Sequence, residues 1–447
     1  MFKAGVRGLF ITIGYIFLSV GAYANNTPQI HTHINPERIT SIACDTTAQS
    51  CLGVGFEFKF KKLSEKASSF SMENTVYKTK DGGKTWGEPQ HLSHGIHDAV
   101  LDGWDGMERF MFASKEAGMK VYCNASAQKC LVAGPKVINK QFYTIVHQIG
   151  DAGLTSSHEA ALLPTPDLAD MRVDGIACSD SGNQCLLLNY PYVYTSDDLG
   201  TTWSSPRLLP EPASGYETHD GAYRDTQMRC SDSGLMCTVI AHNQYPADQA
   251  PIFIYVTKDG GATWSTPYAL EAADKQIEAT DTDVISGLHC DSSGLKCMAL
   301  RARLLNDEHV LNTRVDVYTT EDSGVHWDNI SQVDNQDGMI EEALGPLDCD
   351  KTGNTCVVIH AEAGTEDATA NAYITHDRGQ SWTHQRIAEA NSFWGRTDIA
   401  CDGSGLLCQV VGIKDIDEVP DALRAEQPNI QAQLQQAHLK SQRKAQN

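Results

Sequence analysis

Basic residues are scarce in this chain of 447 residues, which has 35 Lys and Arg against 57 Asp and Glu and a formal net charge of −22. The sequence contains no basic stripe of the kind with which nucleic-acid-binding proteins contact phosphates. The same shortage disfavours attachment to an anionic membrane surface. We therefore expect no nucleic-acid partner and no function at a membrane surface.

Long hydrophobic runs are also missing, apart from one at the N-terminus. Lys3 and Arg7 precede an apolar run at 9–18, and Ala-Tyr-Ala at 22–24 matches the A-x-A pattern that signal peptidase accepts. The run is short for a membrane span, and no stop-transfer flank follows it. We expect residues 1–24 to be a signal peptide, with no membrane insertion and a mature chain that is secreted or periplasmic.

No cysteine is left without a partner. All 14 cysteines fall into pairs separated by six residues, and the C-x₂₋₄-C knuckles typical of zinc sites are absent. Turn-forming residues fill the gaps, which predicts tight β-hairpins whose opposed cysteines lie within disulfide reach. So many cysteines behind a signal peptide favour structural disulfides. The predicted disulfides are Cys44–Cys51, Cys123–Cys130, Cys178–Cys185, Cys230–Cys237, Cys290–Cys297, Cys349–Cys356 and Cys401–Cys408.

A second repeat runs out of phase with the cysteine pairs. Five segments share the pattern Tyr-x-Ser/Thr-x-Asp-x-Gly-x-x-Trp. We expect each to be a turn between two strands, in which the Asp carboxylate and the Ser/Thr hydroxyl accept backbone N–H groups. Gly would supply a backbone conformation that other residues resist, and Trp would pack on the neighbouring hairpin. The five aspartates are therefore expected to build turns and not to catalyse: Asp81, Asp198, Asp259, Asp322 and Asp377.

The period of these repeats predicts the architecture. Successive cysteine pairs lie about 60 residues apart on average, and every signal within that period is typical of strands and turns. We predict an all-β, seven-bladed β-propeller over residues 25–419, with four-stranded antiparallel blades that each carry a disulfide. A six-bladed ring with a terminal appendage is the alternative. Residues 420–447 are rich in Gln and Ala and are expected to be a polar tail, a short helix or disordered.

The two ends of the chain must close such a ring. No aspartate segment follows the seventh cysteine pair, while residues 29–34 alternate like a strand ahead of the first pair. We expect this N-terminal segment to become an outer strand of the last blade, which would seal the ring and remove a sheet edge.

The five aspartate segments resemble the Asp-box, or BNR, repeats of sialidase-like β-propellers. In that superfamily the box joins the third and fourth strands of a blade. The resemblance covers almost the whole mature chain, and it implies a fold but no particular reaction. A cysteine pair in every blade is not a feature that we associate with sialidases.

The expected topology places the cysteine turns and the aspartate turns on one face of the ring, which should be structural. Ligands should then bind on the opposite face, among variable loops at 87–118, 206–227, 303–314 and 362–371. The first of these holds His91, His94 and His97, whose spacing could suit a metal, although histidines in so long a loop are more often solvated. Aspartate-rich crossings could hold calcium, but no EF-hand spacing is present, and we expect no cofactor.

Four arginines are the candidate ligand-binding residues. Each stands five or six residues before the first cysteine of a pair, near the start of an inner strand whose side chains can converge on the channel mouth. In the sialidases that this chain resembles, three such arginines bind the substrate carboxylate, a task that suits forked guanidinium groups. Pairing with acidic neighbours is the alternative role. The candidates are Arg38, Arg172, Arg224 and Arg396.

Two classes of function follow. The first is an exported propeller that binds a glycan or protein ligand on its loop face. The second is a sialidase-like glycoside hydrolase, which would need a Tyr/Glu nucleophile pair and an Asp acid/base. No motif places those groups in this sequence, so catalytic residues stay unassigned and the binding module is favoured.

Overall fold

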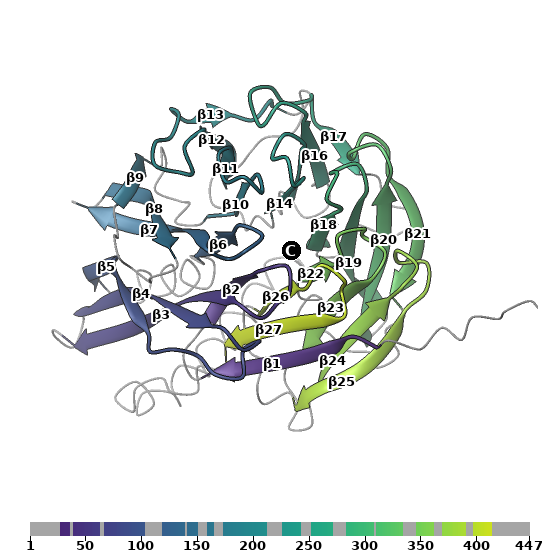
Figure 1. Cartoon of the computed structure of the whole chain (residues 1–447), viewed down its shortest axis with the longest axis horizontal. Helices are drawn as coiled ribbons and strands as arrows, with labels where there is room; N and C mark the ends of the chain where they lie inside the picture. The colour runs from purple at the N-terminus through teal and green to yellow at the C-terminus, as the bar shows by residue number, and fades with distance from the viewer. Residues whose placement is uncertain are drawn as a thin grey trace, which may run out of the picture.

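The computed structural model describes residues 27–35, 39–62, 67–102, 119–138, 141–150, 159–164, 173–211, 226–242, 252–270, 283–307, 310–333, 346–361, 369–389 and 397–413. Every regular element in these ranges is a β-strand, and none of the ranges contains a helix long and apolar enough to cross a membrane. The strands form seven sheets arranged in a ring around one axis (Figure 1). The predicted seven-bladed propeller is thus confirmed, and the six-bladed alternative is wrong.

Six blades are four-stranded antiparallel sheets built from consecutive strands. Blades 1 to 3 are β2 (Ile39–Cys44), β3 (Cys51–Lys62), β4 (Ala67–Thr79), β5 (Gln90–Asp102); β6 (Lys120–Cys123), β7 (Lys129–Ile138), β8 (Gln141–Gly150), β9 (Glu159–Pro164); and β10 (Gly175–Cys178), β11 (Cys185–Asn189), β12 (Tyr192–Ser196), β13 (Arg207–Leu208). Blades 4 to 6 are β14 (Thr226–Cys230), β15 (Cys237–His242), β16 (Ile252–Thr257), β17 (Tyr268–Leu270); β18 (Asp283–Cys290), β19 (Cys297–Asp307), β20 (Val310–Thr320), β21 (Asp328–Val333); and β22 (Leu347–Cys349), β23 (Cys356–Ala361), β24 (Thr369–Thr375), β25 (Thr383–Glu389).

Blade 7 closes the ring with both ends of the chain. It consists of β26 (Thr397–Cys401), β27 (Leu407–Ile413) and the N-terminal strand β1 (Gln29–Asn35). The predicted closure is therefore confirmed, but this blade has three strands, and β1 runs parallel to β27. The direction follows from connectivity, because β1 must end on the side of the ring where β2 begins.

The seven predicted disulfides are all present and join the innermost two strands of each blade at their shared turn. The cysteines of each pair are also direct cross-strand partners in the ladder. Such a short closed loop restricts the unfolded chain by about 2 kcal/mol per bridge in the chain-entropy description. Seven disulfides fit an oxidising environment, as found in the periplasm or outside the cell.

Each aspartate turn is held by the hydrogen bonds that its sequence predicts. In blade 4, Asp259 Oδ1 accepts from Thr257 Oγ1 and Thr263 N, both at 2.8 Å, and Oδ2 accepts from Thr263 Oγ1. The residue after each aspartate and the glycine that follows it both have positive φ, for example 65° at Gly260 and 85° at Gly261. The hydroxyl or imidazole four residues after the aspartate completes the same arrangement in the other four turns.

The two kinds of turn are joined within a blade. In the five blades with an aspartate turn, the residue after the aspartate donates its N–H to a carbonyl of the cysteine turn, as Gly260 N does to Leu235 O at 2.9 Å. The equivalent bonds run from Gly82 to Gln49, Leu199 to Asn183, Ser323 to Leu295 and Arg378 to Asn354. We call the end of the ring that carries both sets of turns the disulfide face and the opposite end the loop face.

A ring of backbone hydrogen bonds also joins neighbouring blades around the axis of the disulfide face. At six of the seven junctions between blades, the residue two positions after the first cysteine donates its N–H to the carbonyl of the equivalent residue in the next blade. Six of these bonds span 2.8 to 3.3 Å: Thr46 to Ala125, Asp180 to Asp232, Asp232 to Ser292, Ser292 to Lys351, Lys351 to Gly403 and Gly403 to Thr46. The innermost turns are therefore tied to one another as well as to their own blades.

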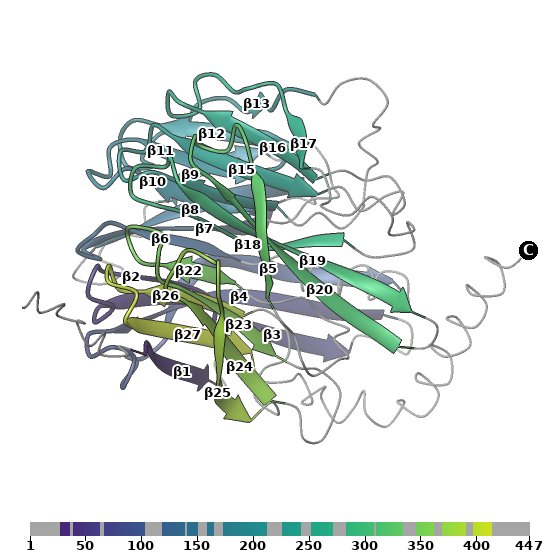
Figure 2. The same ribbon diagram turned by 90° about the vertical axis from the view of Figure 1, so that its right-hand side faces the viewer.

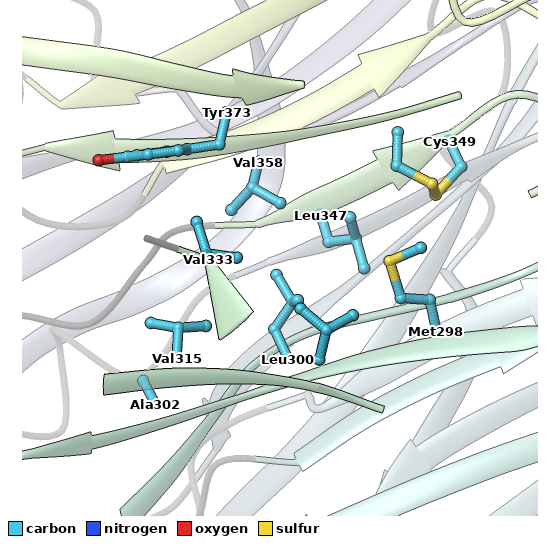
Figure 3. Packing of buried hydrophobic residues seen from close by; sticks show 11 residues of the cluster. Met298, Leu300, Ala302, Val315, Val333, Leu347, Cys349, Val358 and Tyr373 are labelled. Carbon is cyan, nitrogen blue, oxygen red and sulfur yellow. A yellow bond between two sulfur atoms is a disulfide. The ribbon is translucent and has the colours of Figure 1, made fainter. Parts of the chain in front are cut away.

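Apolar side chains fill the interfaces between blades. Seven buried clusters lie one at each interface, and Figure 3 shows the cluster between blades 5 and 6, where Leu300 and Val315 face Leu347 and Val358. The tryptophan of each aspartate turn packs against the interface with the preceding blade, as Trp382 does in this cluster. The predicted packing role of the tryptophans is confirmed.

Strands of very unequal length point toward the loop face. β3 has 12 residues and β19 has 11, whereas β11 has five. At about 3.3 Å per residue, the longest hairpins extend about 20 Å farther than the shortest, and Figure 2 shows β3, β4, β19 and β20 projecting from the ring. All four ranges that we expected to be loops contain strand residues. β5 occupies 90–102 within 87–118, and β13 and the start of β14 fall within 206–227. β19 and β20 leave only two residues between them within 303–314, and β24 begins at Thr369 within 362–371.

Candidate functional site

The four candidate arginines, Arg38, Arg172, Arg224 and Arg396, lie outside the described residues, so their role stays a prediction. Of the histidines considered for metal binding, His91 has a described side chain. It is exposed on β5, and its Nδ1 lies 3.7 Å from Glu73 Oε2 on the neighbouring strand. Among the described residues, no cluster of His, Cys, Asp or Glu is arranged to hold a metal ion.

A pocket of about 200 Å³ opens at the axis on the disulfide face. Its walls come from the inner strands and cysteine turns of blades 1, 4, 5, 6 and 7. The polar side chains that line it are Asp45, Thr46, Asp232, His289, Ser292, Asp348, Lys351 and Asp402. We take this axial pocket as the candidate functional site of the described part of the chain.

The floor of the axial pocket is a polar link between three blades. His289 Nδ1 on β18 lies 2.9 Å from Asp348 Oδ1 on β22, and Asp348 Oδ2 accepts from Cys401 N on β26 at 2.7 Å. Both side chains are mostly covered, with exposed fractions of 14% and 20%. Burial acts to raise the pKa of Asp348, but the hydrogen bond and charge from His289 outweigh it, so this pKa lies below its usual value.

The mouth of the axial pocket carries two opposite charges. Lys351 Nζ of blade 6 lies 3.8 Å from Asp232 Oδ2 of blade 4, and each side chain is nearly half exposed. Burial and the neighbouring Asp180 carboxylate raise the pKa of Asp232, while Lys351 opposes that rise. Lys351 and Asp232 therefore form what we call the open ion pair, because both side chains are partly exposed to solvent. The charged groups that raise the pKa of Asp232 make its surroundings more acidic than basic.

Two of the aspartates in the lining have a structural role instead. Asp45 Oδ1 accepts from Thr47 N, Thr47 Oγ1 and Gln49 N within its own turn. Asp402 binds Ser404 Oγ and the backbone of the same turn. Asp45 Oδ1 and Asp402 are thus used within their own turns, and the remaining polar groups of the pocket besides Asp348 are Thr46, Asp232, His289, Ser292 and Lys351.

Sequence reasoning expected the disulfide face to be structural and missed the axial pocket. A signal was nevertheless present in the repeats. The residue before the first cysteine is Ala43, Tyr122, Ala177 and Ala400 in four blades, but it is Arg229, His289 and Asp348 in blades 4, 5 and 6. An alignment of the seven cysteine turns therefore shows Arg, His and Asp in three consecutive blades at a position that holds alanine or tyrosine in the other four.

Comparisons with other proteins found no matching family and no matching curated protein. Among solved structures, an ulvan lyase bound to its glucuronate–rhamnose sulfate substrate has 9% sequence identity and a TM-score of 0.43, and the match covers 81% of this chain and 88% of that one. A mutant NanB sialidase from Streptococcus pneumoniae has 13% identity and a TM-score of 0.39, over 85% of this chain and 66% of that one. An α-L-arabinanase from Penicillium chrysogenum has 12% identity and a TM-score of 0.38, over 81% and 89%. Similarity of this degree carries no conclusion about the activity of this chain.

Proposed function

We propose that this chain is an exported Asp-box β-propeller that acts as a binding module, with a glycan or protein ligand held on its loop face. The observation that supports this most is the construction of the opposite face. Seven disulfides, five paired turns and the axial ring of backbone hydrogen bonds fix the disulfide ends of the blades. A rigid base of this kind suits recognition by segments that project from the other end.

The unequal hairpins give the proposal its second support. β3 and β4 of blade 1 and β19 and β20 of blade 5 extend well beyond β11 and β12 of blade 3 on the loop face. The loop face is therefore uneven in height, and an extended ligand would meet projecting hairpins as well as the axis. Export follows from the signal-like segment 1–24 and agrees with the seven disulfides.

The experiment is a glycan array probed with the mature, oxidised protein, beside a turnover assay with a fluorogenic sialoside. We expect retention on defined glycans, no turnover, and a loss of retention of about tenfold in Arg38→Ala or Arg224→Ala, because a forked guanidinium group is lost. Arg386→Ala, an exposed arginine on the outer strand β25 of blade 6 and outside the four expected loops, is the matched control and should bind normally. Turnover that disappears in Arg38→Ala would replace the binding module with a sialidase-like hydrolase.

A further inference from the structure

The axial pocket contains titratable side chains at positions where the fold does not require them. Four blades place alanine or tyrosine before the first cysteine, and their turns are still closed by the same ladder pairing and disulfide. Placing His289 and Asp348 at this position in blades 5 and 6 buries titratable groups, which costs stability unless they are paired. Gly403 of blade 7 lines the pocket without a side chain, which leaves space there.

Hydrogen-bonding capacity in the axial pocket is only partly used by the described residues. The separation of 3.8 Å between Lys351 Nζ and Asp232 Oδ2 is longer than a hydrogen bond, so neither group satisfies the other. Within the described ranges, His289 Nε2 has no hydrogen-bond partner. The pocket therefore presents a partly exposed ammonium and carboxylate side by side, while His289 Nε2 is buried in its wall.

The size and charge of the pocket restrict what can fill it. About 200 Å³ is below the volume of roughly 300 to 1,000 Å³ that drug-sized ligands occupy, so the occupant is a small molecule. A simple carboxylate would satisfy Lys351 but face Asp232, and a simple amine would satisfy Asp232 but face Lys351. A molecule with an ammonium and a carboxylate on the same carbon atom satisfies both members of the open ion pair.

We propose that the axial pocket on the disulfide face binds a free α-amino acid. The ammonium of the ligand pairs with Asp232, its carboxylate pairs with Lys351, and its side chain lies toward Ser292 and His289. The neighbouring Asp180 adds negative charge on the Asp232 side, which favours the ammonium there. Asp348 holds His289 through Nδ1 and is a positioning residue. This site is separate from the loop face, so it does not depend on the proposed binding module.

The test is isothermal titration of the mature, oxidised protein with three probes: L-serine, acetate and methylamine. We expect L-serine to bind in the millimolar range or better, and acetate and methylamine to bind at least about tenfold more weakly, because each can satisfy one half of the ion pair. Lys351→Ala and Asp232→Asn should each weaken the binding of L-serine by about tenfold or more.

The chain offers a matched control for these variants. Lys296 Nζ and Glu321 Oε2 are also 3.8 Å apart, and Lys296 has the same 46% exposure as Lys351, but neither residue lines the axial pocket. Lys296→Ala and Glu321→Gln should therefore leave the binding of L-serine unchanged. The proposal is overturned if L-serine does not bind at about 10 mM, if methylamine or acetate binds as well as L-serine, or if both pairs of variants behave alike.

Discussion

Blade 7 differs from the other six blades in how its strands are brought together. Each of the six is a consecutive antiparallel meander, whereas blade 7 combines the last two strands of the sheet region with the first one. β1 and β27 are paired over seven residues that lie almost 400 positions apart in the chain, as the partners Gln29 and Leu407 show. Like blade 2, blade 7 has no aspartate turn among its described residues. Ring closure therefore depends on contacts that carry a large chain-entropy cost.

Side chains at the junction of blades 7 and 1 offset part of that cost. Asp398 Oδ2 accepts from Ser41 Oγ at 2.8 Å and from Ile42 N at 2.9 Å, so a carboxylate of blade 7 binds the inner strand of blade 1. The fully buried Gln409 donates to Ala48 O at 3.2 Å across the same junction. The comparison teaches that every blade packs against its neighbours, whereas blade 7 also depends on a strand from the other end of the chain.

Deletion of residues 27–36 should lower the stability of the protein more than any other change considered, because it removes the strand that closes blade 7. It removes β1, exposes the edge of β27 and removes Ile30 from its contact with the cluster between blades 6 and 7. We expect the thermal midpoint to fall by on the order of 10 °C, measured by circular dichroism on the oxidised protein. Gln29→Ala, at an exposed position of the same strand, is the control and should change the midpoint little. A deletion variant as stable as the parent would mean that β1 does not close the ring.

Asp398→Ala should have the next largest effect. It leaves the buried N–H of Ile42 and the hydroxyl of Ser41 without their acceptor at the junction of blades 7 and 1. The free energy of unfolding should fall by about 2 kcal/mol in urea denaturation. Asp328→Ala, an exposed aspartate on β21, is the matched control. If both variants lost the same free energy of unfolding, the hydrogen bonds at the junction of blades 7 and 1 would have no special role in stability.

Asp259→Ala should lower the free energy of unfolding by a smaller amount, because it removes hydrogen bonds within one blade. The aspartate turn of blade 4 would lose the acceptor of Thr257 Oγ1 and Thr263 N, and about 1 kcal/mol of unfolding free energy with it. Because the lesion lies within one blade, we expect the hydrogen exchange of blade 7 to stay as in the parent. Faster exchange across the whole ring would contradict that local character.

Acidification should weaken the aspartate turns by a modest amount. Hydrogen bonds from Thr85 lower the pKa of Asp81 to about 2, and hydrogen bonds from Thr263 lower that of Asp259 below its usual value. Since these pKa values are lower in the folded chain, the stabilisation is present above about pH 4 and is lost as pH falls toward about 2. Urea midpoints measured across this window should decline, and the decline should be shallower in Asp259→Asn. A slope unchanged by that substitution would exclude the turn carboxylates as its source.

Much of the fold follows from the sequence because its signals are local. A cysteine turn or an aspartate turn is contained in about ten residues, so repeated patterns predict the seven disulfides, the turn hydrogen bonds and the position of each tryptophan. The direction of β1 and the three strands of blade 7 depend on how distant segments meet, which no local pattern contains. The sequence of β5 predicts a loop because its apolar residues do not alternate regularly with polar ones, and its pairing with β4 contains register shifts.

The candidate site was less predictable for the same physical reason. His289, Asp348 and Cys401 N form one hydrogen-bonded link, although about 50 residues separate each from the next. Only the ring brings together equivalent positions of successive repeats, and Lys351 and Asp232 meet because they occupy the same position in blades 6 and 4. The four arginines predicted for the loop face lie outside the described residues and stay a prediction.

Hydrogen exchange at the axis tests the closed disulfide face most directly. The amides of Thr46, Asp232 and Ser292 lie at turns that are open to solvent, but each donates to the next blade. We predict that in the oxidised protein they exchange as slowly as the inner-strand amides, because all the bonds of the ring must open together. Exchange as fast as that of an ordinary exposed turn would contradict the ring and the rigid base that the proposed function requires.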